Sequence, residues 1–134
     1  MVTVEIWGKK FPLCLTVAAL AEVEEKCGGL DGLAAHLDGK NEAGETSLAR
    51  MAIHTTWMLG VLIREGEANR IYCARFFEPK AEPVAVPDEE ALRHLLTVKS
   101  ALSYRPAVLK AINESLEREI EAVYPKNAES GERS

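Results

Sequence analysis

The chain of 134 residues has the length of one domain, and its 47% hydrophobic and 28% charged residues are typical of a folded globular protein. Sixteen basic and 21 acidic residues give a net charge of −5, whereas a protein that binds nucleic acid through its phosphates normally has a basic excess. Aromatic residues make up only 6%, which argues against a surface that stacks bases. The composition therefore predicts one mildly acidic domain without a nucleic-acid partner.

Cysteine usage and the N-terminus both bear on where the protein works. Cys14, Cys27 and Cys73 are odd in number and widely spaced, which is unlike a disulfide framework and indicates a reducing compartment. The N-terminus lacks the basic and apolar stretches of a signal peptide. The most apolar stretch, residues 51–63, is shorter than the about 20 apolar residues that cross a bilayer. We expect a cytoplasmic protein that does not enter a membrane.

The N-terminal residues 2–15 predict a small β-hairpin. Residues 2–7 alternate between two faces at the strand period, and a second β-prone run covers 11–15 after a turn at Gly8. Pro12 has no N–H to donate, so we expect the second strand to be short or to lie at an edge.

Two short helices are predicted next. The first covers residues 17–27, with Thr16 as its N-cap and Gly28 at its C-terminal end. The second lies within residues 30–37, where apolar side chains recur at helical spacing.

The strongest predicted element is a long apolar helix that begins after a cap at Thr46 or Ser47 and runs to about Gly66. Most of its apolar residues form one continuous stripe, but a second apolar group lies on the opposite side. That group consists of Ile53, Trp57 and Val61. Two interpretations follow: a central helix buried on both sides, which is the more common arrangement, or a helix that keeps one face for a partner.

The remaining residues are mostly helical. Residues 67–77 fit either a continuation of the long helix or a short strand, and prolines then produce an extended linker over 79–87. Asp88 caps a short helix after this linker. The last helix begins at Ser103 or Tyr104 and carries a regular apolar stripe.

These elements predict a mainly α (α+β) fold, with a short N-terminal β-hairpin followed by a bundle of four to five amphipathic helices. The sequence contains no internal repeat, so we expect one helical domain over residues 1–124. Pro125 ends the last helix, and the polar residues 125–134 predict a disordered tail.

The titratable residues form no evident catalytic or metal site. His36, His54 and His94 lie on three different predicted helices, and no CxxC or HxxxH pair offers zinc ligands. The sequence has no nucleophile elbow, P-loop or dinucleotide fingerprint. We therefore expect no enzyme, cofactor or metal, although a site in which His54 meets Cys27 or Cys73 in space is an alternative that sequence alone leaves open.

The order of features in residues 8–37 is more telling than any single residue. A glycine–lysine turn leads into an apolar run that ends in threonine, and an acidic helix, a double glycine and a leucine-rich segment follow. This order resembles the opening of the tail assembly chaperones of long-tailed bacteriophages and their prophage and gene-transfer-agent relatives. The matching positions are Gly8, Lys9, Phe11, Pro12, Leu13, Leu15, Thr16, Ala19, Leu20, Glu22, Glu24, Glu25, Gly28, Gly29, Leu30 and Leu33.

The close match covers under a quarter of the chain, and the linker over 79–87 is not part of the pattern. The resemblance implies a non-catalytic protein of the bacterial host cytoplasm that binds the tape-measure protein and tail-tube protein during assembly and is absent from the mature virion. It is compatible with a homo-oligomer.

A chaperone of this kind needs apolar surface that a partner can cover. The candidate partner-binding residues are Ile53, Trp57, Val61, Phe76 and Phe77. The alternative is that these side chains simply close the core. Two other functions fit the chain: a structural phage tail or head–tail joining protein, which is usually rich in β structure, and a small helical adaptor or regulator.

Overall fold

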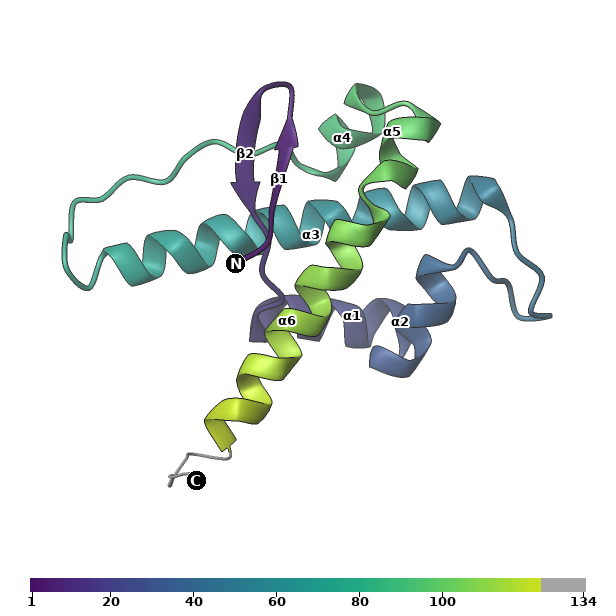
Figure 1. Ribbon diagram of the computed structural model, residues 1–134, viewed down its shortest axis with the longest axis horizontal. Coiled ribbons are helices and arrows are strands. Elements are labelled where there is room, and N and C mark those ends of the chain that lie inside the picture. Colours follow the sequence, from purple (N-terminus) through teal and green to yellow (C-terminus); the bar gives the residue numbers. More distant parts are fainter. Residues whose placement is uncertain (124–134) are drawn as a thin grey trace.

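The computed structural model describes the backbone of residues 1–123 and the side chains of residues 1–116. A β-hairpin and several shorter helices surround one long central helix (Figure 1). The elements in chain order are β1 (Thr3–Ile6), β2 (Lys9–Pro12), α1 (Val17–Cys27), α2 (Leu30–Leu37), α3 (Leu48–Ala74), α4 (Glu89–Leu95), α5 (Val98–Ser103) and α6 (Arg105–Val123). The prediction of a mainly α fold with a small N-terminal hairpin is confirmed.

The hairpin has a tighter turn and an earlier second strand than the sequence suggested. Trp7 and Gly8 adopt φ angles of 53° and 79°, and β1 pairs antiparallel with β2 so that Val4 lies opposite Phe11. Positive φ at both central residues is typical of the two-residue turn that best matches strand twist. The expected strand over 11–15 is wrong in its bounds, because from Cys14 onward the backbone bonds elsewhere: its N–H donates to the carbonyl of Leu62 on α3 at 3.3 Å.

Helix α3 is the centre of the fold and is longer than predicted. It spans 27 residues and continues through the ambiguous segment to Ala74, so the predicted end near Gly66 is wrong. Gly66, Glu67 and Ile71 are buried beyond that point, which explains why the helix persists there. The hairpin, α4 and α5 pack on one side of α3, while α1 and α2 lie on another and α6 crosses it (Figure 1).

The polar residues at the helix ends act as the sequence predicted. The side chains of Thr16, Ser47 and Asp88 each accept a hydrogen bond from a backbone N–H in the first turn of the helix that follows. Gly28 ends α1 in the left-handed conformation, with φ of 77°. These three N-caps and one C-cap are confirmed.

The region before α6 contains a short helix that the sequence did not separate. Thr97 and Ser100 form a capping box at the start of α5, and α6 then begins at Arg105. The predicted end of α6 at Pro125 and the predicted tail over 125–134 lie outside the described residues.

Candidate partner-binding surface

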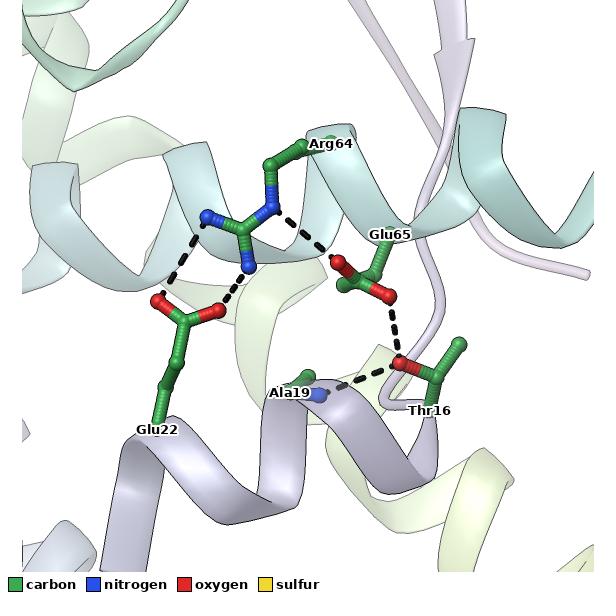
Figure 2. A network of polar contacts seen from close by, with 5 residues as sticks. All are labelled: Thr16, Ala19, Glu22, Arg64 and Glu65. Atoms are coloured by element: carbon green, nitrogen blue, oxygen red, sulfur yellow. Dashed lines mark hydrogen bonds and ion pairs between the residues drawn. The ribbon is translucent and has the colours of Figure 1, made fainter. Parts of the chain in front are cut away.

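A network of polar contacts fastens α1 to the middle of α3 (Figure 2). Thr16 accepts from the N–H of Ala19 at 3.1 Å and donates its hydroxyl to Glu65 at 2.7 Å. Arg64 then bonds Glu65 through Nε at 3.0 Å and Glu22 through its two terminal nitrogens. The N-cap residue of α1 is thus bonded to Glu65 of α3, and Glu22 of α1 is bonded to Arg64 of α3.

Arg64 is held as a cation by this network. Partial burial alone lowers the pKa of Arg64, but the hydrogen bonds that Arg64 donates to Glu22 and Glu65 outweigh burial and raise it. The network therefore fixes where α1 lies on α3, and its donors and acceptors are used within the fold.

Two of the predicted partner-binding residues are part of the core. Trp57 and Val61 are only 6% and 3% exposed and belong to the main hydrophobic cluster. Lys26 of α1 lies over the Trp57 ring, with Nζ 5.1 Å from the ring centroid. At these positions α3 is a central helix that is buried on both sides, so neither side chain is available to a partner in this conformation.

Ile53, from the same predicted face, lies in a different environment. It is 48% exposed and forms one wall of an open groove of about 240 Å³ between α3, α4 and α5. The other lining residues are mostly apolar: Ala52, Thr56, Leu92, Arg93, Leu96, Thr97, Val98 and Ala101. One turn separates Ile53 from Trp57. His36 of α2 and Lys26 of α1 lie against the Trp57 ring, whereas Ile53 borders the open groove, so the predicted face is divided.

Phe76 and Phe77 are the most exposed large apolar side chains of the described residues, at 87% and 93%. They directly follow α3 at the point where the chain turns back, and this end of α3 projects away from the other helices (Figure 1). We call the pair the aromatic tip. Two adjacent aromatic side chains in full contact with solvent are unusual in a monomeric protein, so the aromatic tip is a candidate partner-binding surface.

The segment after the aromatic tip is held against α3 by polar side chains of that helix and its C-cap. These side chains, Glu67, Arg70 and Arg75, are called the strap. Glu67 accepts from the N–H of Val84 at 2.6 Å, and Arg70 bonds Glu67 at 2.7 Å through each of two nitrogens. Arg75 donates to the carbonyl of Ala81 at 3.1 Å. The proline-rich linker is therefore fastened along α3 at these points, and the aromatic tip stands at a fixed turn.

The strap depends on an ionised glutamate. The hydrogen bond from Arg70 lowers the pKa of Glu67, burial of the carboxylate opposes that change, and the N–H of Val84 lowers the pKa further. Glu67 is 7% exposed, so its charge is stable only because both partners are present.

A further exposed aromatic residue was missed by the sequence analysis. Trp7 is 77% exposed at the hairpin turn and lines a second open groove, of about 300 Å³, with apolar residues of the hairpin, the linker and α4. Its position directly before Gly8 was a usable signal, because a tryptophan in a two-residue turn points to solvent. A bulky residue at positive φ is also an outlier of the kind that often marks a functional position.

The histidines are arranged in a way that helical spacing could not predict. His36 and His54 stack on each other across α2 and α3, whereas His94 lies exposed on α4 and bonds Glu90 at 3.3 Å. The partner of His54 is thus a second histidine. Within residues 1–116, no group of three or more His, Cys, Asp and Glu side chains is placed to hold a metal ion.

Cys27 and Cys73 form no disulfide; Cys14 and Cys27 are half-buried, whereas Cys73 is exposed. Burial raises the pKa of Cys27, although nearby Lys26 opposes that change, so this thiol stays protonated at neutral pH. None of the described helices is long and apolar enough to cross a membrane.

No family model, curated protein or solved structure matches this chain. Its function is therefore inferred from the pattern in residues 8–37 and from the aromatic tip and the grooves described above.

Proposed function

We propose that this protein is a non-catalytic tail assembly chaperone of a long-tailed bacteriophage or prophage. The observation that carries the proposal is the ordered pattern of residues 8–37, which resembles the opening of that family. Several of its residues have a clear place in the fold: Gly8 in the hairpin turn, Thr16 and Gly28 at the two ends of α1. The pattern thus covers the end of the hairpin turn, β2, α1 and α2.

The exposed apolar surface supports the same proposal. A chaperone that keeps an aggregation-prone protein in solution has to offer apolar side chains to it while remaining soluble itself. The aromatic tip offers two phenylalanines, and the Ile53 groove offers a concave apolar surface next to α4 and α5. The proposed partners are the tape-measure protein and the tail-tube protein, in the cytoplasm of the bacterial host.

The alternative of a structural tail or head–tail joining protein is less well supported. Such proteins are usually rich in β structure, and the only strands among residues 1–123 are the two of the N-terminal hairpin. A small helical adaptor or regulator would use the same apolar surfaces, so the identity of the partner distinguishes this second candidate from the first.

The proposal is tested by producing the chain together with the tape-measure protein of the same genome. We expect more of the tape-measure protein in the soluble fraction than when it is produced alone, and we expect the two to co-purify. A matched control replaces this chain by an unrelated helical protein of similar size. If this chain changes neither solubility nor recovery relative to that control, the proposed function is wrong.

A further inference from the structure

Two histidines from different helices stack face to face where α2 packs on α3. The ring centroids of His36 and His54 are 3.6 Å apart, and the ring planes are 5° from parallel. Trp57 meets the His36 ring edge-on, with centroids 5.4 Å apart and an interplanar angle of 86°. Nδ1 of His54 also lies 2.7 Å from the carbonyl oxygen of His36; a carbonyl only accepts, so this nitrogen carries the proton. The contact between α2 and α3 is therefore built on imidazole rings.

Among residues 1–116, no negative charge is placed to offset a proton added to His36. Its Nε2 atom is buried without a hydrogen-bond partner among the described residues. Lys26, from α1, acts on the ring electrostatically and is itself positive, and Cys27 beside it is a neutral thiol. A protonated His36 would thus lie near the positive charge of Lys26 on α1 and against the imidazole of His54 on α3, and both disfavour the charged form of His36.

The other elements around α2 contribute cations as well. Arg50 of α3 donates to a backbone carbonyl just past the end of α2, at 2.9 Å. Arg105 of α6 binds the last carbonyl of α2 and the carboxylate of Asp38. Asp38 is therefore already engaged with Arg105, and it does not offset a charge on the histidine stack.

We propose that the His36–His54 stack is an acid-sensitive latch: protonation of His36 releases α2 from α3 and uncovers the part of Trp57 that His36 covers. The uncovered surface is apolar, because Trp57 and its neighbour Val61 belong to the hydrophobic core. This proposal concerns the fold of the chain itself and does not depend on the proposed function.

The direction of the pH dependence follows from the packing. Burial, His54 and Lys26 together lower the pKa of His36 from 6.5 to about 4. In the released helix His36 has the usual histidine pKa of 6.5 and takes up a proton as the pH falls below that value. In the closed form the lowered pKa keeps His36 neutral there. The closed form is therefore fully stable above pH 6.5 and loses stability as the pH falls from 6.5 towards 4. Because the ring is only partly buried, we expect the release equilibrium to rise about 10- to 100-fold over that range.

The test is amide hydrogen exchange of the whole chain, expressed as protection factors at pH 7 and pH 4.5. We expect the amides of α2 to lose protection about 10- to 100-fold at pH 4.5 while those in the middle of α3 keep theirs. In a Trp7→Phe background Trp57 is the one remaining tryptophan, so its emission should shift to longer wavelength over the same range. Equal protection of α2 at both pH values, or loss of protection throughout the chain at once, would overturn the latch.

The variants separate the latch from general acid sensitivity. His36→Phe keeps an aromatic ring against His54 and Trp57 but cannot be protonated, so α2 should keep its protection at pH 4.5. His94→Phe is the matched control, because His94 is exposed on α4, and this variant should behave as the wild type. If His36→Phe retains the wild-type pH dependence, the proposal is wrong.

Should His36→Phe fail to fold, an NMR titration of the wild-type imidazole decides instead. A measured pKa of His36 well below 6.5 supports the latch, and one at or above 6.5 overturns it. Neither result affects the solubility test of the proposed function.

Discussion

Gly66 of α3 lies directly against the backbone carbonyl of Pro12, at the end of β2. A Cβ atom at position 66 would overlap the carbonyl oxygen of Pro12 and would lie 2.6 Å from its carbonyl carbon. The N–H of Cys14 donates to the carbonyl of Leu62 one helical turn away, which keeps the strand and the helix in this close approach. The hairpin can therefore dock on α3 only if residue 66 has no side chain.

Gly66→Ala should consequently destabilise the fold. The overlap is with backbone, which cannot move aside as a flexible side chain could, so we expect a loss of about 1–3 kcal/mol in the free energy of unfolding. Gly60→Ala is the matched control in the same helix, since its Cβ would lie 3.5 Å from Leu92 and Glu89. Alanine is the better helix former, so this control should be neutral or stabilising by up to about 1 kcal/mol. Urea denaturation of both variants measures the difference, and equal effects would contradict the close approach.

Trp57→Ala should cost about 3–5 kcal/mol of stability, the usual range for a large buried aromatic residue. Trp7→Ala removes the same side chain from an exposed position, so its effect should stay within about 0.5 kcal/mol. Thermal or urea unfolding of the two variants gives the comparison. A loss below about 1 kcal/mol for Trp57→Ala, together with loss of partner binding, would instead identify Trp57 as an interface residue.

Glu67→Gln should weaken the strap in a pH-dependent way. The pKa of Glu67 is lowered in the folded chain, so its carboxylate contributes stability above about pH 4.5, and that contribution is lost as the pH falls further. At pH 7 the variant should lose about 1 kcal/mol, because Arg70 is partly in water and the ion pair is screened. The difference from the wild type should shrink at pH 3.

Glu82→Gln is the control for this experiment, because position 82 enters the strap only through its backbone carbonyl. Urea unfolding at pH 7 and pH 3 compares the variants. A Glu67→Gln deficit that is as large at pH 3 as at pH 7 would mean that the carboxylate charge does not hold the strap.

Local signals in the sequence were enough to predict several elements of this fold. The threonine, serine and aspartate N-caps are each used as predicted, because capping needs only residues within one turn of each other. The fold class followed from the alternation in the hairpin and from the helical spacing after it. The end of α3 could not be predicted in this way, because the burial of Ile71 and Glu67 depends on segments that lie elsewhere in the sequence.

The candidate site was only partly predictable for a related reason. Helical spacing placed Ile53 and Trp57 on one face correctly, but it could not show that the other elements cover Trp57 and leave Ile53 open. The stack of His36 on His54 joins two helices, and no spacing within either helix reveals it. Phe76 and Phe77 are followed by a linker that the strap fastens to α3, and helical spacing cannot reveal bonds between side chains and a segment without regular structure.

The double variant Phe76→Ser/Phe77→Ser tests the aromatic tip. Both side chains are almost fully exposed, so we expect the free energy of unfolding to change by less than about 0.5 kcal/mol for each substitution. In the co-production experiment, the variant should no longer keep the tape-measure protein soluble, because the aromatic contact is lost. Tyr72→Ser is the matched control, since it removes another exposed aromatic residue, 70% exposed, from the same end of α3. If the double variant protects the tape-measure protein as well as the wild type does, the partner binds elsewhere, and the Ile53 groove becomes the surface to test with Ile53→Glu.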